Sequence, residues 1–173
     1  MANGVHTLEE ERDEAAVRRA RDYRRVGLVA LLLLVVAGLV GVMGVTSTTV
    51  TAEGGGSTLA VTHARVTRAG VAVPLHVSVR RPGGFDGPIR LAVSAALLER
   101  FDFQNFYPNP SKETADGDFL LYEFDPPPGP DFRLSMDART APDQNGSAGR
   151  YEVRLLDEGA VLARVSFRMV VVP

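Results

Sequence analysis

The sequence predicts a mainly β protein, in which one amino-terminal transmembrane helix precedes a seven-stranded antiparallel β-sandwich. Residues 26–45 form a run of 20 residues without a charged side chain, which is typical of a helix that crosses a bilayer. From residue 58 onward, apolar and polar side chains alternate with a period of two. That pattern is typical of strands that bury one face.

Residues 1–25 are predicted to form a cytoplasmic helical arm. Arginines crowd its carboxyl end, and they are the predicted topology determinants: Arg18, Arg19, Arg21, Arg24 and Arg25. On the other side of the run, the next basic residue is Arg65. Basic residues beside a span favour the cytoplasmic side. The sequence therefore predicts a single-pass plasma-membrane protein with a cytoplasmic amino terminus and an extracytoplasmic carboxyl-terminal domain.

The apolar run at 26–45 is interpreted as an uncleaved anchor in the lipid bilayer. The alternative is a cleavable signal peptide, because Val50-Thr51-Ala52 has the small residues of a cleavage site. The run is longer than the apolar region of a signal peptide, and a long arm precedes it, so the anchor is favoured.

One stripe of the predicted span is rich in small residues at alternating steps of three and four. Small side chains at this spacing let two helices approach closely. The stripe therefore predicts a helix-docking face, for another membrane protein or for a second copy of this chain. A lone helix surrounded by lipid is the alternative. The face consists of Gly27, Ala30, Leu34, Ala37, Gly41 and Gly44.

Residues 46–57, TSTTVTAEGGGS, are predicted to be a flexible Thr/Ser/Gly linker. The outer domain then covers 58–173. Its seven predicted strands are separated by Gly, Pro, Asp and Asn turns. They are 58–63, 73–80, 89–94, 120–124, 132–139, 151–155 and 161–169. Residues 95–107 are compatible with strand, helix and loop.

A short motif points to a fold family. Gly149-Arg150-Tyr151-Glu152-Val153 resembles the G-x-Y-x-C segment near the start of strand F in immunoglobulin-like domains, with Val153 at the cysteine position. The resemblance implies a cysteine-free, fibronectin type III-like sandwich. It also implies that Tyr151 is a corner tyrosine whose hydroxyl bonds back to the chain, with Gly149 and Val153 as structural neighbours. The whole chain resembles bacterial single-pass proteins with an outer domain of this kind, a resemblance that implies no activity.

The sequence contains no catalytic motif, and we expect neither an enzyme nor a cofactor. There is no cysteine, which excludes disulfides and thiolate chemistry. His63 and His76 lack a fixed third ligand, so no metal site is expected. The net charge of −2 gives no indication of a nucleic-acid partner.

One aromatic segment stands out. Phe101, Phe103, Phe106 and Tyr107 lie within seven residues of one another. Exposed, they would form a contact patch for a partner; buried, they would be a strand that covers one end of the core.

Taken together, these features favour a membrane-anchored interaction or accessory subunit. It would present an immunoglobulin-like domain outside the cell and dock to another membrane protein through its span. The alternative is a stand-alone surface module that binds cell-wall or carbohydrate material.

Overall fold

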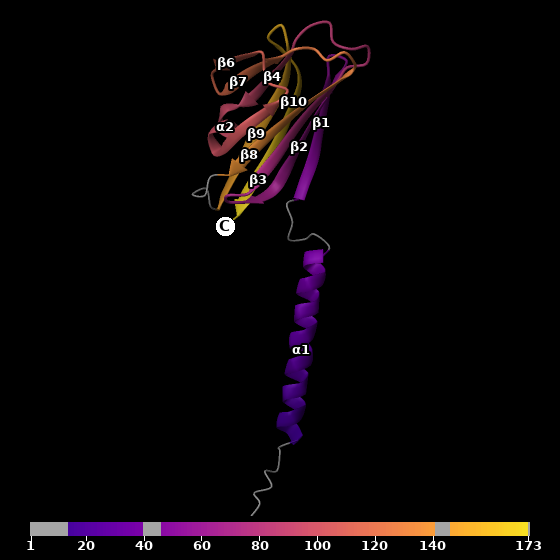
Figure 1. Cartoon of the computed structure of the whole chain (residues 1–173), viewed down its shortest axis with the longest axis vertical. Helices are drawn as coiled ribbons and strands as arrows, with labels where there is room; N and C mark the ends of the chain where they lie inside the picture. Colours follow the sequence, from indigo (N-terminus) through magenta and orange to yellow (C-terminus); the bar gives the residue numbers. More distant parts are fainter. Residues whose placement is uncertain (1–13, 40–45, 141–145, 173) are drawn as a thin grey trace, which may run out of the picture. The chain divides into compact units, whose positions relative to one another are not determined.

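The computed structural model describes residues 14–39, 46–140 and 146–172. The chain consists of two compact units, Met1–Gly44 and Val45–Pro173. The first unit contains the helix α1 (Glu14–Leu39). The second is a β domain with one short helix, and the prediction of a mainly β protein is confirmed (Figure 1).

Helix α1 contradicts the predicted membrane span. Within residues 14–39, 46–140 and 146–172, no helix combines the length and the hydropathy needed to cross a bilayer. Charged side chains occupy the first half of α1, and the rest of the described helix, 26–39, is apolar.

This finding also contradicts the predicted single-pass localisation, with its cytoplasmic amino terminus and extracytoplasmic domain. The five arginines predicted as topology determinants, between Arg18 and Arg25, lie exposed on α1. Residues 40–45 of the predicted span lie outside the described residues.

The β domain is built from ten strands. They form one curled sheet in the order β5-β8-β3-β2-β10-β9-β4-β7-β6, with β1 paired to β2. In chain order the elements are β1 (Thr46–Gly54), β2 (Ser57–Arg68), β3 (Ala72–Arg80), β4 (Ile89–Ser94), α2 (Ala95–Arg100), β5 (Phe101–Tyr107), β6 (Lys112–Asp116), β7 (Phe119–Phe124), β8 (Asp131–Thr140), β9 (Ser147–Asp157) and β10 (Ala160–Val172).

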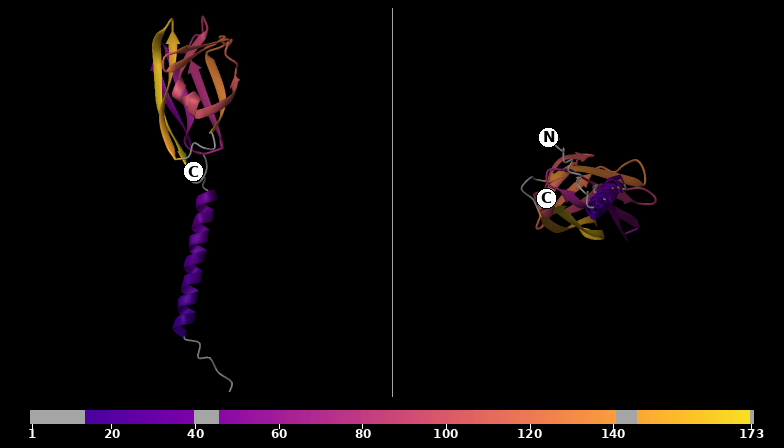
Figure 2. Two further views of the ribbon diagram at one scale, coloured as in Figure 1. Left: turned by 90° about the vertical axis from the view of Figure 1, so that its left-hand side faces the viewer. Right: turned by 90° about the horizontal axis from the view of Figure 1, so that it is seen from below.

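The curl of the sheet produces two layers that enclose one core (Figure 2). We call β1, β2, β3, β8 and β5 the first layer, and β10, β9, β4, β7 and β6 the second layer. In β3, for example, Val73, Leu75, Val77 and Val79 are buried while the residues between them are exposed or half-buried. Alternation of this kind is what the period-two pattern of the sequence predicts.

All seven predicted segments are strands, but the sheet differs from the predicted sandwich in two respects. It has ten strands instead of seven, because β1, β5 and β6 were not predicted as strands. It is also mixed, since the ends of β2 and β10 pair in parallel. Residues 95–107, which the sequence left open, are the short helix α2 followed by β5.

The predicted flexible linker is the strand β1 and its hairpin turn. Thr46 to Gly54 pairs with β2 over its whole length. Gly55 and Gly56 form the turn, with φ of +57° and +70°. Two positive φ angles are what the tight two-residue hairpin requires, and glycine adopts them without a steric penalty. The Thr-rich segment is therefore part of the sheet, because threonine favours extended backbone.

Strand β2 connects the two layers. Its first half pairs with β3, and its last three residues pair with β10. Between these halves the alternation is interrupted, since His63 and Ala64 are both buried and Arg65 and Val66 are both exposed. The His63 ring stacks on Phe167 of β10 with 4.5 Å between ring centroids.

Candidate functional site

A shallow groove lies on the outer face of the first layer. It has a volume of about 500 Å³ and is lined from β3, β5 and β8. The strand register places His76 of β3 opposite Ser135 of β8, and Ser135 opposite Tyr107 of β5. The three side chains therefore form one row across the sheet, and Ser78 and Arg133 form the neighbouring pair.

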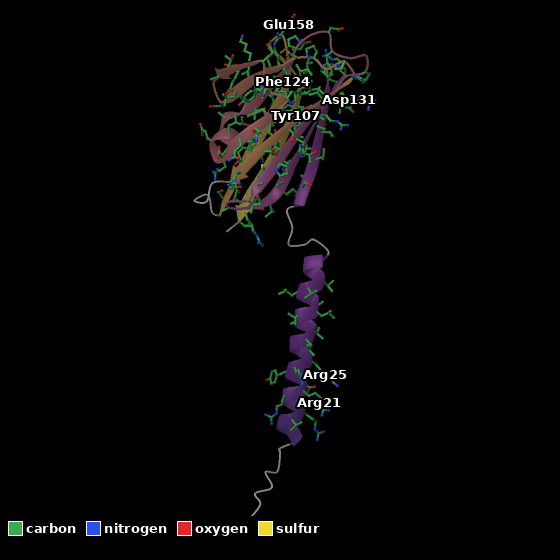
Figure 3. The ribbon with its side chains drawn as sticks, in the orientation of Figure 1. Arg21, Arg25, Tyr107, Phe124, Asp131 and Glu158 are labelled. Carbon is green, nitrogen blue, oxygen red and sulfur yellow. The ribbon has the colours of Figure 1, made fainter. Side chains whose placement is uncertain are left out.

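The shape of the groove follows from the sizes of these side chains. Ser78 and Ser135 have small, half-buried side chains, whereas the side chains of His76, Tyr107 and Arg133 are long and exposed. Tyr107 is 80% exposed, which is unusual for so large a ring, and it is labelled in Figure 3. The groove thus combines an aromatic surface with hydroxyl, imidazole and guanidinium groups.

Among the described residues, the groove lacks two kinds of contact on which many catalytic sites are built. In the described part of the chain, no hydrogen bond joins His76 to either serine, so the contact of a nucleophile with a base is not formed. Groups of three or more potential metal ligands are also absent from the described residues. The groove offers hydrogen-bond donors and acceptors around an exposed ring, which is the composition of a ligand site.

The structure separates the four residues of the predicted aromatic patch. Phe101 is 1% exposed and packs edge-on against Tyr151. Phe103 and Phe106 are half-buried and pack against the core, and Tyr107 alone projects outward. Because β5 is a strand at the edge of the first layer, its aromatic side chains divide between the core and the surface, and a joint contact patch is not formed.

The inward aromatics of β5 connect the two layers. The Phe106 ring lies 5.1 Å from the Tyr122 ring of β7. Burial and the Glu113 carboxylate, which also accepts the phenol's hydrogen bond, raise the pKa of Tyr122 to about 12. The phenol therefore stays neutral, as a group between two apolar layers must.

The structural residues of the immunoglobulin-like motif lie in β9. Val153 is fully buried and Tyr151 is 4% exposed. The Tyr151 ring lies across the backbone of Gly149, so that a Cβ at Gly149 would overlap the phenol. Among the described residues the Tyr151 hydroxyl makes no hydrogen bond, and the predicted corner bond is not found. Burial raises the pKa of Tyr151, while the nearby Arg100 lowers it in part.

The predicted helix-docking face is only partly described. Gly27, Ala30, Leu34 and Ala37 lie on α1, while Gly41 and Gly44 lie outside the described residues. A Cβ added at Gly27 would meet no atom within 4 Å. Leu31 to Leu34 are 58–64% exposed, so within the described structure the apolar side chains of α1 are uncovered.

A second cavity, of about 320 Å³, lies where the loop after β3 meets the β9–β10 turn. The Arg81 Nε donates a hydrogen bond of 2.9 Å to Ser57 Oγ, and the lining includes Asp86, Asp157 and Glu158. Because these carboxylates offset the charge of Arg81, the cavity presents no single sign of charge to a ligand.

The sequence did not reveal the groove residues His76, Ser78, Arg133 and Ser135 as a site. The alternation does predict that they face outward, which is the one signal available. Which outward residues become neighbours depends on the register between strands that are distant in the chain, as His76 and Ser135 are.

Comparison with known proteins gives a limited result. Neither protein-family models nor curated proteins match the sequence. Among solved structures, the chain is similar to the major pilin subunit BcpA of Bacillus cereus, with a TM-score of 0.41 and 10% identity over 74% of this chain and 40% of that one.

It is also similar to the alkylpurine DNA glycosylase AlkC of Pseudomonas fluorescens, bound to DNA containing an abasic site analog. Here the TM-score is 0.30 and the identity 15%, over 76% of this chain and 32% of that one. The chain thus spans less than half of either structure. At these scores neither similarity bears on function.

Proposed function

We propose that this chain is a non-catalytic interaction or accessory subunit, and that its β domain binds a carbohydrate in the groove between His76 and Tyr107. The observation that carries the proposal is that the exposed Tyr107 ring lines the same groove as the small side chains of Ser78 and Ser135. A sugar ring has an apolar C–H face that packs on an aromatic ring. Its hydroxyls find donors and acceptors in Ser78, Ser135, His76 and Arg133.

The groove suits a polymer more than a small ligand. Its lining comes from three neighbouring strands that pair antiparallel, and a shallow groove on a sheet face does not require a chain of sugars to end inside it. Cell-wall glycan has this extended form. Small ligands, in contrast, are usually enclosed in deep pockets that cover most of their surface.

The test is the binding of purified soluble cell-wall glycan to the full chain, measured by isothermal titration calorimetry. Tyr107→Ala should weaken binding about tenfold, because a factor of ten corresponds to about 1.4 kcal/mol, within the range expected for a stacked ring. Tyr107→Phe keeps the ring and should bind like the wild type. Since Tyr107 is exposed, both variants should keep the wild-type melting temperature. Equal binding by Tyr107→Ala would contradict the proposal.

We also propose that the two layers are a variant of the immunoglobulin-like sandwich. The orders β2-β3-β8-β5 and β10-β9-β4 correspond to the two sheets ABED and GFC of that fold. The parallel contact between β2 and β10 joins the first and last strands. On this assignment β1 and the β6–β7 hairpin are additions. Domains of this architecture commonly serve recognition, which supports a binding role by analogy alone.

A second contact, through α1, is favoured by its uncovered apolar side chains. We propose that the face of Gly27, Ala30, Leu34 and Ala37 docks to the α1 helix of a second copy, because its steps of three and four are those of a helix pair. The chain has no cysteine, so a disulfide formed by a single introduced cysteine must join two copies of the chain. Ala30→Cys should crosslink under oxidation and Leu32→Cys, on the opposite side of α1, should not. Equal crosslinking at both positions would count against the docking face.

A further inference from the structure

Two pairs of arginines face each other across β9 and β10, on the outer face of the second layer. Arg154 lies opposite Arg164, and Arg150 lies opposite Arg168. Between the two pairs, Glu152 lies opposite Ser166. Like charges directly opposite each other on neighbouring strands are destabilising. Each pair therefore needs a negative charge to offset it.

Glu152 offsets the first pair. Its Oε1 accepts a short hydrogen bond from Arg154 Nε and lies 3.4 Å from Arg164 Nε. Its Oε2 accepts a hydrogen bond of 3.2 Å from Ser166 Oγ. Both oxygens of Glu152 are thus occupied. Arg154 gains a further contact, since its Cζ lies 3.9 Å over the Phe119 ring.

Within 14–39, 46–140 and 146–172, no carboxylate forms an ion pair with the second pair of arginines. None of the ion pairs among the described residues includes Arg150 or Arg168, and both side chains are exposed. The next outward pair along the two strands, Ala148 and Val170, is uncharged. On this face of the sheet, Glu152 therefore neutralises one arginine pair, and no carboxylate of the described residues neutralises the other.

We propose that Arg150 and Arg168 bind a phosphate monoester. Two guanidinium groups on neighbouring strands offer two forks of N–H donors about 5 Å apart at their Cβ atoms. A carboxylate has one charge and two oxygens, and a single fork satisfies it. A phosphate monoester carries nearly two negative charges at neutral pH and three free oxygens, and so matches both forks and neutralises both arginines.

The site is separate from the groove of the proposed carbohydrate ligand. The groove lies on the outer face of the first layer, whereas Arg150 and Arg168 lie on the outer face of the second layer. A failure of carbohydrate binding would therefore leave the phosphate site untouched, and the reverse also holds.

The test uses the full chain and measures its melting temperature in inorganic phosphate, glycerol phosphate, acetate and chloride at equal ionic strength. Phosphate should raise the wild-type melting temperature by about 3–6 °C at ten times its dissociation constant. Arg150→Gln and Arg168→Gln should abolish this rise. In chloride both variants should melt at or slightly above the wild-type temperature, because the repulsion between the two arginines is removed.

Arg164→Gln is the matched control, since it lies four residues from Arg168 on the same strand but belongs to the neutralised pair. It should keep the full phosphate shift and show no gain of stability in chloride. A larger shift with glycerol phosphate than with inorganic phosphate identifies an ester as the ligand, and equal shifts identify the free ion. An equal rise in acetate, or an undiminished phosphate shift in Arg168→Gln, would overturn the proposal.

Discussion

At the scale of single residues, the contact between Gly149 and Tyr151 explains the motif better than a corner hydrogen bond does. Because the ring lies on the glycine backbone, Gly149→Ala would force the phenol away, and overpacking of this kind costs about 1–3 kcal/mol. Tyr151→Phe should cost almost nothing, since the hydroxyl has no partner among the described residues. The free energy of unfolding in urea measures both variants.

A double-mutant cycle separates ring packing from other causes. In a Tyr151→Val background the ring is gone, so Gly149→Ala should be neutral or stabilising, because alanine restricts the unfolded chain more than glycine does. An equal cost of Gly149→Ala in both backgrounds would show that ring packing is not the reason for the glycine.

His63 makes the stability of the β domain depend on pH. Its Nδ1–H donates a hydrogen bond of 3.0 Å to the Ala64 carbonyl. Burial lowers the pKa of His63, the hydrogen bond to Ala64 raises it in part, and the charge of Arg65 lowers it further, with a net decrease. The neutral form is thus favoured in the folded state. Stability from this group is complete above the unfolded pKa of about 6.5 and is lost as the pH falls below it.

The expected result is a decrease of the free energy of unfolding between pH 7 and pH 5, with a slope of at most about 1.4 kcal/mol per pH unit from this residue. His63→Phe retains a ring against Phe167 and should flatten the curve. A wild-type curve that stays flat over this range would contradict the role of His63.

At the scale of elements, the β1–β2 hairpin has the most direct test. A Cβ on Gly54 would overlap the backbone carbonyl of Leu162 in β10, and a backbone group cannot turn aside as a side chain can. Gly54→Ala should therefore lower the free energy of unfolding by about 2 kcal/mol or more. Gly87→Ala is the control, because a Cβ there meets no atom within 4 Å. A flexible linker, as the sequence predicted, would tolerate both changes equally.

The sequence predicted those elements whose own side chains alternate. In β8, every second residue is apolar, which predicts a strand with one buried face, and the strand is found there. These residues are Phe132, Leu134, Met136 and Ala138. Strand β6 contains no large apolar residue and all its side chains are exposed, so nothing in its own composition distinguishes it from a loop. It is a strand because β7 offers it a free edge, which is a property of another segment.

The sequence did not predict strand β1, and the reason differs from that for β6. Its Thr-rich composition favours extended backbone, but it ends at Gly54 and two more glycines follow. Glycine-rich segments are typical of linkers as well as of turns. Only the pairing partner decides between these, and the partner is β2. The groove depends on strand pairing even more than β1 does. The row of side chains from His76 to Tyr107 forms only when β3 and β5 both pair with β8 in the observed registers.

At the scale of the whole molecule, the β domain should fold without α1. It forms a compact unit from Val45 onward, and its core contains no residue of α1. A chain of residues 46–173 should therefore unfold cooperatively with the melting temperature of the full protein. Circular dichroism in a thermal scan measures this.

A chain that begins at Ser57 is the informative comparison. It lacks β1 and with it Val50 and Ala52, which pack against the core, and it leaves one edge of β2 open. Its melting temperature should be lower by several degrees, since a lost strand removes both hydrogen bonds and apolar burial. Equal melting of the two shorter chains would show that β1 is dispensable.

The pairing of β2 has a topological consequence. Thr46 of β1 and Val170 of β10 both pair with Val66, on opposite sides of β2. Thr46 at the start of the β domain and Val170 near its end therefore lie about 10 Å apart, which is twice the spacing between neighbouring strands. Joining these positions with a short glycine-rich bridge and cutting the chain in the Gly117 turn would give a circular permutant with the same strand pairings. Because these two positions are close together, the domain should also be tolerated as an insertion in a surface loop of another protein. The two ends of that loop would not need to move apart.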